Sequence, residues 1–318
     1  MKYKNNAKPY FSIITPTFNR PEQLNNAILS VLDQSFENFE HIIVDDNSVS
    51  ATEKIIAAIG DKRLKYIRRT INGGPAAARN TGIKYASGEF ICFLDDDDVF
   101  LSEMLQHLYD MFQADNELEF VWTGISRLEK KDKQEVEFRR NVGPRYYEDG
   151  EEGLAMASSI AAGFGLCIKK SCFNKIGFFD ESLKFGEDTD MVIRLAKSCK
   201  FGTVPKVLVK IYQHQYNQLS DMRFHIENYE IYRRIIQKHY NFLSKHPKVM
   251  HMHLKAFTKI CYHVGKKSQG RKMYLKLIMK FPFYRILYAD LLCYEIVGTH
   301  YAEWLRERRN TRRSKKSK

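Results

Sequence analysis

The sequence lacks the features that assign a chain to several common classes. No stretch of about 18 residues is free of charged side chains, which argues against a membrane-spanning helix. The six cysteines form no CxxC pair and mostly lie in apolar segments, as buried reduced thiols do. The basic start, residues 1–6, leads into a strand pattern without an apolar signal core. Together these absences predict a cytoplasmic protein.

The two common phosphate-binding loops are missing as well. Gly73, Gly74 and Pro75 provide neither a GxGxxG pattern nor a loop that ends in GKS or GKT. A dinucleotide-binding or P-loop protein is therefore excluded. If the chain binds a nucleotide, its phosphates need a metal ion and an arginine as their cradle.

The composition is that of a globular protein with a basic end. With 318 residues, 44% of them hydrophobic, the chain is long enough for one large domain and an appendage. The net charge is +13, and from Tyr301 onward there are eight Lys or Arg but only two Glu. We expect an exposed tail with affinity for an anionic membrane surface. No nucleic-acid partner is expected, because these charges do not lie beside exposed aromatics on a sheet.

The first hundred residues alternate strand and helix patterns. Short β-branched runs bounded by polar turns predict strands, and apolar side chains at helical spacing behind a proline predict helices. This βαβα order predicts an α/β fold with a mostly parallel sheet flanked by helices. The expected strands are residues 11–17, 41–45, 64–67 and 89–94, and the expected helices are 21–34 and 75–86.

The pattern changes twice in the rest of the chain. Residues 129–149 are highly charged and predict an exposed loop or hairpin. Beyond residue 220 only long helical stretches follow, so we place a domain boundary between 219 and 220. Residues 273–305 could form amphipathic helices on a membrane surface or a helical cap on the main domain. Between these changes we expect a helix at 101–113, strands at 165–168 and 204–212, and a helix at 188–197.

Polar residues follow each of the first four strands. The run Asp95 to Asp98 comes directly after an apolar strand, where like charges raise one another's pKa values and a hard divalent cation would compensate them. A solvated acidic turn explains this run equally well. The carboxyl ends of parallel strands share one edge of the sheet, where ligands collect. Singly, however, the residues after the other strands could merely cap helices or form turns.

As an ordered set, these residues resemble the family 2 glycosyltransferases of the GT-A fold, over about the first 215 residues. The resemblance implies a Rossmann-like nucleotide-sugar half at about 1–120 and an acceptor half at about 121–219. The C-terminal helical basic extension that we expect at 220–318 lies beyond this resemblance. The motifs that carry it are Pro16-Thr17-Phe18-Asn19, Val44-Asp45-Asp46-Asn47-Ser48, Asn72-Gly73-Gly74, Ala78-Arg79-Asn80-Thr81-Gly82 and Leu94-Asp95-Asp96-Asp97-Asp98.

The resemblance implies a role for each of these residues in binding a nucleoside-diphosphate sugar. Asp46 would accept from a nucleobase N–H, and Phe18 would lie against the base. Arg79 would pair with the diphosphate or hold Asp95 in place. Asp97 would coordinate Mn²⁺ or Mg²⁺, ions that prefer oxygen ligands. The implied donor-binding residues are Pro16, Thr17, Phe18, Asp46, Asn72, Arg79, Asp95, Asp96 and Glu187.

Two later segments complete the implied site. Glu187 and Asp188 precede an apolar helix, and in the family such a pair supplies the general base, here Asp188. A helix N-cap is the plainer interpretation of an isolated aspartate at this position. His214 follows a strand and is a candidate second metal ligand, although a lone histidine is more often structural.

The expected function is that of a metal-dependent, inverting glycosyltransferase. Its acceptor would be a hydroxyl of a saccharide or lipid-linked saccharide, in the synthesis of a cell-surface polysaccharide on the inner face of the membrane. Two alternatives stay open. A sugar-1-phosphate nucleotidyltransferase would need a glycine- and lysine-bearing triphosphate loop, which Thr15 to Asn19 do not form. A non-catalytic sugar-nucleotide binder would have no need of Asp188.

Overall fold

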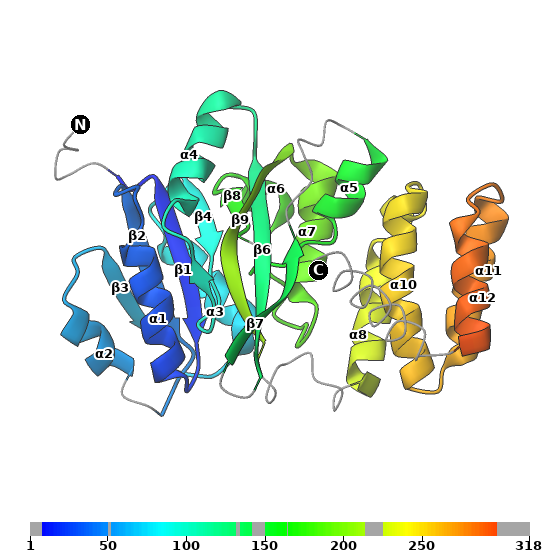
Figure 1. The fold of residues 1–318 in the computed structure, drawn as a ribbon, viewed down its shortest axis with the longest axis horizontal. Coiled ribbons are helices and arrows are strands. Elements are labelled where there is room, and N and C mark those ends of the chain that lie inside the picture. The colour runs from blue at the N-terminus through cyan, green and yellow to red at the C-terminus, as the bar shows by residue number, and fades with distance from the viewer. Residues whose placement is uncertain are drawn as a thin grey trace. The chain divides into compact units, whose positions relative to one another are not determined.

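A computed structural model describes residues 8–49, 52–131, 134–141, 150–163, 165–213 and 225–297 (Figure 1). The chain divides into two compact units, Met1–Gln218 and Leu219–Lys318. The first unit holds a nine-stranded sheet with helices packed against it, and the described part of the second is helical. The predicted α/β fold is therefore confirmed.

The first half of the sheet is parallel. Its strands lie in the order β3-β2-β1-β4 and are β1 (Phe11–Thr17), β2 (Phe39–Asp45), β3 (Leu64–Arg68) and β4 (Phe90–Phe93). Parallel neighbours need crossovers, and three helices supply them: α1 (Pro21–Leu32), α2 (Thr52–Ile59) and α3 (Gly74–Tyr85). The polar loops that follow these strands are therefore at one edge of the sheet.

Alternating side chains of β1 belong to two separate cores. Ile14 packs in a cluster with the alanines of α3, while Ile13 packs in a second cluster with Ala27 and Val31 of α1. Because successive strand residues point to opposite faces, α1 and α3 cover opposite faces of the sheet. Burial on both faces explains why the central strands read as continuous apolar runs rather than as alternating ones.

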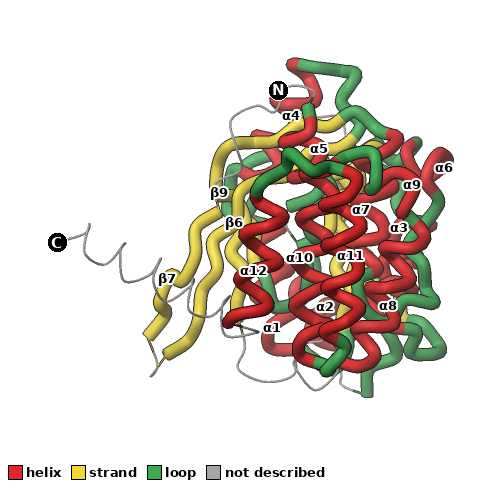
Figure 2. The backbone as a smooth tube through the Cα atoms, turned by 90° about the vertical axis from the view of Figure 1, so that its right-hand side faces the viewer, coloured by secondary structure: helices red, strands yellow, loops and turns green. Residues whose placement is uncertain are grey.

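The second half of the sheet is mixed. Strand β8 (Cys167–Lys169) pairs antiparallel with both β4 and β6 (Phe120–Lys131), and β6 pairs parallel with β9 (Phe201–Gln213). Strand β5 (Val99–Phe100) pairs with β9. Figure 2 shows β6, β7 and β9 as long neighbouring strands in yellow. The hairpin of β6 and β7 (Gln134–Asn141) confirms the hairpin alternative for the charged segment.

Four helices accompany this half, and two of them were not predicted. Helices α4 (Met104–Ala114) and α7 (Glu187–Ser198) lie within two or three residues of their predicted bounds. Helices α5 (Glu151–Ala157) and α6 (Cys172–Ile176) have seven and five residues, too few for an apolar stripe to repeat. The start of β6 was also missed, since a short apolar run does not distinguish strand from helix.

The described part of the second unit consists of helices. They are α8 (His225–Lys238), α9 (Tyr240–Leu243), α10 (Pro247–His263), α11 (Lys267–Lys280) and α12 (Ile286–Val297). Helix α11 packs against both α10 and α12 (Figure 2). Tyr274 and Leu277 of α11 are buried, as are Leu254 and Phe257 of α10. Among the described residues, no helix combines the length and the apolarity that a bilayer span requires.

Gly82 lies where α3 packs tightly against Ile14 of β1. A Cβ atom built there would overlap the Cγ2 of Ile14 and lie 3.1 Å from its Cδ1. We therefore expect Gly82→Ala to lower the free energy of unfolding by about 1–3 kcal/mol, despite the higher helix propensity of alanine. Urea unfolding measures this change. Lys84→Ala, at an exposed position of the same helix, serves as the control; an equal effect of both substitutions would contradict the close packing.

Candidate active site

The loops after β1 and β2 are joined to each other at the carboxyl edge of the sheet. The Asn19 N–H donates to Ser48 Oγ at 2.9 Å, and the Val49 N–H donates to Asn19 Oδ1 at 2.9 Å. Asn19 and Asn47 have φ angles of 56° and 69°, in the left-handed region that asparagine tolerates better than most residues. These sharp turns hold the two loops in place beside the strand ends.

Asp46 directly follows β2 and is buried against the first residues of α3. Its carboxylate accepts hydrogen bonds from the Gly73 N–H at 3.1 Å and the Gly74 N–H at 2.7 Å. Arg69 forms an ion pair with the same carboxylate. Arg69 was not predicted, because it follows β3 without belonging to a motif. The predicted contact of Asp46 with a nucleobase would therefore be made by a carboxylate that already has three partners and a fixed orientation.

Asp96 and Asp97 share the guanidinium of Arg20. Its Nη1 lies 3.1 Å from Asp96 Oδ1 and 2.9 Å from Asp97 Oδ2. Thr17 also donates to Asp96 at 2.8 Å. Burial is the main cause that raises the pKa of Asp96 to about 6, although Arg20 and Thr17 act against it. A positive charge between two carboxylates is already part of this loop.

Asp98 is directed to the other half of the sheet. It accepts a hydrogen bond at 3.1 Å from the backbone N–H of Tyr212 near the end of β9. Burial, followed by the neighbouring Asp95 and Asp97, raises the pKa of Asp98 well above its ordinary value. Gly163 comes close to this loop, since a Cβ there would lie 3.2 Å from Asp95 Oδ2. The aspartate run is thus packed into the molecule, and the solvated-turn interpretation is wrong for Asp96 and Asp98.

Arg79 connects α3 to the acidic loop and to α7. Its guanidinium lies 2.7 Å from Asp95 Oδ1 and 2.8 Å from Glu187 Oε1, and its side chain is only 6% exposed. Burial favours the neutral form of Arg79, but Asp95 and Glu187 raise its pKa above the ordinary value. Of the two predicted roles, the structure shows the second, in which Arg79 holds Asp95.

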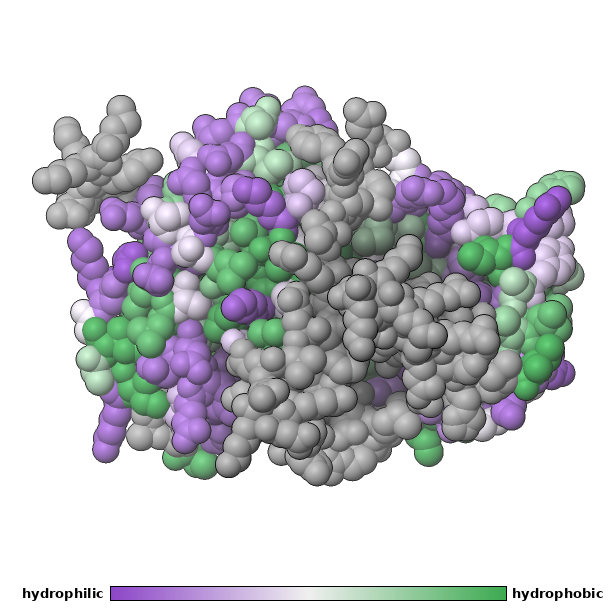
Figure 3. Space-filling view, viewed as in Figure 1, coloured by the Kyte–Doolittle hydropathy of each residue, from purple (hydrophilic) through white to green (hydrophobic). Residues whose placement is uncertain are grey.

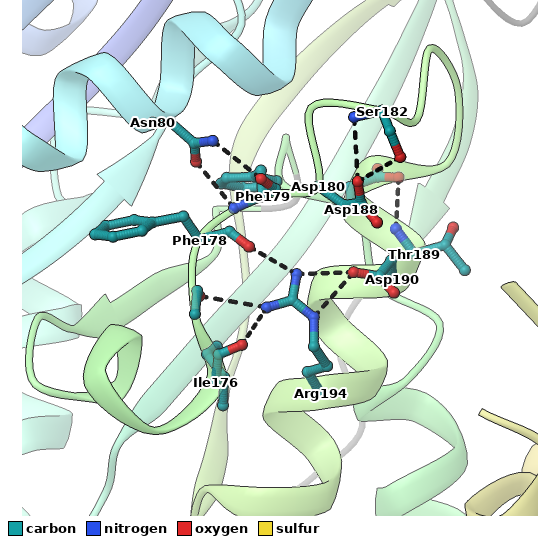
Figure 4. Close-up of polar contacts among 11 residues, drawn as sticks. Asn80, Ile176, Phe178, Phe179, Asp180, Ser182, Asp188, Thr189, Asp190 and Arg194 are labelled. Carbon is teal, nitrogen blue, oxygen red and sulfur yellow. Dashed lines mark hydrogen bonds and ion pairs between the residues drawn. The ribbon is translucent and has the colours of Figure 1, made fainter. Parts of the chain in front are cut away.

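The loop that leads into α7 is fixed by two residues of neighbouring helices (Figure 4). Asn80 of α3 donates to the Phe179 carbonyl at 3.0 Å and accepts from the Phe179 N–H at 2.9 Å. Arg194 of α7 donates to the carbonyls of Ile176 and Phe178 and pairs with buried Asp190. These hydrogen bonds hold the loop before α7 in place, and Asp188 lies in the first turn of that helix. Helical spacing predicted the helix but not that Arg194 folds back onto the loop.

Asp188 lies in the first turn of α7 and is half-buried. Helix α7 begins at Glu187 with Gly186 in the N-cap position, so the N-cap interpretation of Asp188 is wrong. One carboxylate oxygen accepts from the Thr189 N–H at 2.7 Å. Burial, followed by the charge of Glu187, raises the pKa of Asp188 to about 6. Such a carboxylate is ionised at neutral pH but holds a proton more readily than an exposed aspartate, as a general base requires.

Among the described residues, one group of three possible metal ligands is clustered, and the acidic loop does not form such a group. Glu119, Cys172 and Cys199 place ligand atoms within 4.8 Å of one another, but Glu119 is paired with Lys175 and thiols suit soft ions. The acidic loop offers the oxygen ligands that Mn²⁺ and Mg²⁺ prefer. These ions commonly take one or two protein carboxylates and complete their shell with water and phosphate. Arg20 already pairs with Asp96 and Asp97, so a metal ion held by Asp97 would share this carboxylate with Arg20.

The remaining predicted residues lie at the same edge or outside the described chain. Phe18 is 45% exposed directly after β1, Pro16 is half-buried at the end of that strand, and Asn72 is exposed before α3. Their contacts with a donor stay predictions. His214 lies outside the described residues, one position beyond the end of β9.

The family model described as Glycosyl transferase family 2 matches residues 12–174, which span the four parallel strands and the acidic loop. The chain belongs to this family. An uncharacterised glycosyltransferase of Rickettsia typhi is 30% identical over 230 residues, which are 71% of each chain. A Campylobacter jejuni relative, GalNAc(5)-diNAcBac-PP-undecaprenol beta-1,3-glucosyltransferase, is 33% identical over 61% of this chain and 62% of that protein.

Solved structures of S. aureus TarS have a similar fold. S. aureus TarS 1–349 in complex with UDP-GlcNAc superposes with a TM-score of 0.62 over 86% of this chain and 92% of TarS 1–349. The identity is 18%, so the likeness concerns the fold alone. TarS 1–349 in complex with UDP gives a TM-score of 0.60.

The ion pairs of Arg79 should contribute more to stability than those of Arg20, because the guanidinium of Arg79 is more deeply buried. Arg79→Met leaves Asp95 and Glu187 without their cation, and we expect a loss of about 3–5 kcal/mol in the free energy of unfolding. Arg20→Met, whose side chain is 36% exposed, should cost about 1 kcal/mol or less. Urea unfolding of both variants compares them. Equal losses would show that Arg79 does not carry this connection.

Proposed function

We propose that this family 2 glycosyltransferase transfers a sugar from a nucleoside diphosphate to an acceptor hydroxyl with inversion at the anomeric carbon. The observation that carries the proposal is the connection made by Arg79. This one guanidinium joins Asp95 of the acidic loop to Glu187, the neighbour of the candidate base Asp188. A site for the departing diphosphate and a site for the attacking hydroxyl are thereby held next to each other.

The donor half of the site would be the carboxyl edge of β1 to β4. Asp46 and Phe18 would take the base, and Thr17, Asn72 and Asp96 would contribute polar contacts. TarS, whose fold is the same, has been solved with UDP-GlcNAc and with UDP, which supports a nucleotide-sugar donor here. Asp97, with His214 as a second candidate, would hold Mn²⁺ or Mg²⁺, and such an ion supplies positive charge to the departing diphosphate.

The reaction proposed is a single displacement. Asp188 takes the proton of the acceptor hydroxyl, and the oxygen attacks C1 of the sugar from the face opposite the diphosphate. The new C1–O bond forms while the bond from C1 to the diphosphate oxygen breaks, and that bond's electron pair leaves with the diphosphate. Arg79 keeps the carboxylates of Asp95 and Glu187 in place throughout. No covalent sugar-enzyme intermediate is formed.

The acceptor proposed is a saccharide, in particular a lipid-linked saccharide of cell-surface polysaccharide synthesis on the cytoplasmic side of a membrane. The name of the Campylobacter relative places its acceptor on undecaprenol through a diphosphate, and this supports an acceptor of that class. The basic C-terminal residues support a location at an anionic surface.

The two alternative functions, a nucleotidyltransferase and a non-catalytic binder, would give other products in the same assay. Incubation with a panel of sugar nucleotides and an acceptor should release nucleoside diphosphate only when acceptor is present. A nucleotidyltransferase, given a sugar 1-phosphate and a nucleoside triphosphate, would release pyrophosphate. A pure binder would release neither product.

Substitutions of Asp188 and Asp97 should separate catalysis from donor binding. We expect Asp188→Asn to abolish turnover, about 10²-fold or more, while donor affinity in Mn²⁺ stays near that of the wild type. Asp97→Ala should lower both turnover and donor affinity. Isothermal calorimetry with the sugar nucleotide gives the affinities, and diphosphate release gives the rates. Equal donor affinity in the wild type and both variants would overturn the assignment of Asp97.

The rate should depend on the protonation of Asp188. Its raised pKa of about 6 means that the carboxylate loses its proton as the pH rises through 6. Since a general base must be ionised, kcat/KM should fall about tenfold per pH unit below 6 and level off above it. A steady-state pH profile measures this limb. A profile without an acidic limb between pH 5 and 7 would count against Asp188 as the base.

A further inference from the structure

We propose that helices α11 and α12 form a docking face that binds the surface of an anionic lipid bilayer. We define the docking face by its exposed apolar side chains: Leu275, Met279, Phe283, Ile286, Leu292 and Ile296. The inference deepens the proposed function, on which it rests for its purpose, because a lipid-linked acceptor is reached only from a bilayer surface. Its physical basis is independent of the catalytic site.

The docking face has a pair of apolar side chains on one side of each helix. Leu275 and Met279 are four residues apart on α11, and Leu292 and Ile296 are four apart on α12, so each pair lies on one side of its helix. Phe283, in the turn between the helices, is 94% exposed. In Figure 3 hydrophobic residues in green gather at the right-hand edge, over α11 and α12 of Figure 1. Contiguous apolar surface of this kind marks an interaction site, unlike single exposed residues.

The residues of the docking face are not needed for the core of the unit. The opposite sides of the same helices already pack inside the unit, where Tyr274, Leu277 and Leu287 are buried. The two acidic residues of α12 also have partners within the unit. Asp290 pairs with His251 and Lys255, and Glu295 pairs with Arg271. The docking face therefore carries apolar side chains without an unpaired negative charge of α12.

Basic side chains accompany the docking face. Lys272, Lys276, Lys280 and Arg285 are exposed on α11 and the following turn, and no ion pair involves them within the part of the chain that the structure describes. Residues 225–297 contain 14 Lys or Arg and four Asp or Glu, a net charge of +10. Residues 1–218 contain 28 Lys or Arg and 31 Asp or Glu, a net charge of −3. The positive charge of the protein is thus concentrated in the unit that carries the docking face.

This pairing of charge and apolar surface favours a bilayer over the other possible occupants. Apolar side chains with lysines alongside suit the boundary between acyl chains and anionic headgroups. A second copy of the chain would bring two strongly positive surfaces together, and lysine is depleted in protein interfaces. The short α11 and α12 would lie on the bilayer rather than cross it, since 14 and 12 residues do not span about 30 Å of hydrocarbon.

Flotation of the full chain with vesicles tests the proposal. We expect the wild type to float with vesicles of phosphatidylcholine and phosphatidylglycerol, and about tenfold less with phosphatidylcholine alone. Met279→Ser, Phe283→Ser and Ile296→Ser together should reduce binding to the anionic vesicles about tenfold or more. Lys272→Glu, Lys276→Glu and Lys280→Glu together should reduce it similarly, and salt should weaken what binding remains.

A matched pair of variants controls for exposed apolar area. Met279 is 74% exposed, and Ile226 of α8 in the same unit is 75% exposed but lies outside the docking face. Met279→Ser should weaken flotation while Ile226→Ser leaves it unchanged. Circular dichroism and thermal unfolding verify that both variants are folded.

Three outcomes would overturn the proposal. The first is unchanged flotation of the triple serine variant, which would leave charge outside the docking face as the cause of binding. The second is equal binding to neutral and anionic vesicles. The third is dissociation of a wild-type dimer by the triple serine substitution, which would assign the docking face to self-association. Calorimetry of donor binding without vesicles separates these outcomes from a failure of the proposed catalysis.

Discussion

The candidate site depends on the ion pairs of the buried Arg79 guanidinium. This guanidinium lies between Asp95 and Glu187, which belong to segments about ninety residues apart in the chain. A charge buried to this degree is stable only with its counter-ions in place, and the two carboxylates are equally costly without it. The acidic loop and the start of α7 are therefore positioned by one electrostatic requirement. Asn80, the next residue, and Arg194 add neutral and charged hydrogen bonds to the same loop.

The site carries more negative charge than its own cations compensate. Arg20 lies between Asp96 and Asp97, yet the pKa values of Asp96 and Asp98 are still raised by their burial. Carboxylates held in this state gain from an additional positive charge, whether it comes from a metal ion or from protons. This excess negative charge lies within the part of the chain that the Glycosyl transferase family 2 model matches. The same burial prepares Asp188 to accept a proton.

The two units differ in net charge. The sheet unit has a slight net negative charge and concentrates its carboxylates at the strand ends, where they can act on a substrate through a cation. The helical unit has a strong net positive charge and exposes aliphatic side chains on its last described helices. A soluble donor and an acceptor in a membrane have different physical requirements. This division of charge would serve both in one chain.

Much of the fold and of the site could be predicted from the sequence, because the patterns involved are local. Apolar runs with polar ends mark β1 to β4, and the motif order places Thr17, Asp46, Asp95 to Asp98 and Asp188 at one edge of a parallel sheet. The partners of these residues are not local. Packing between distant segments decides that Arg79 pairs with Asp95. It also brings Arg69 to Asp46 and Arg194 to Asp190. Short α5 and α6, and the apolar start of β6, are specified by tertiary burial rather than by periodicity. Local sequence thus predicts candidate residues for the chemistry. Only the folded chain decides which charges compensate one another, because that depends on distances in space.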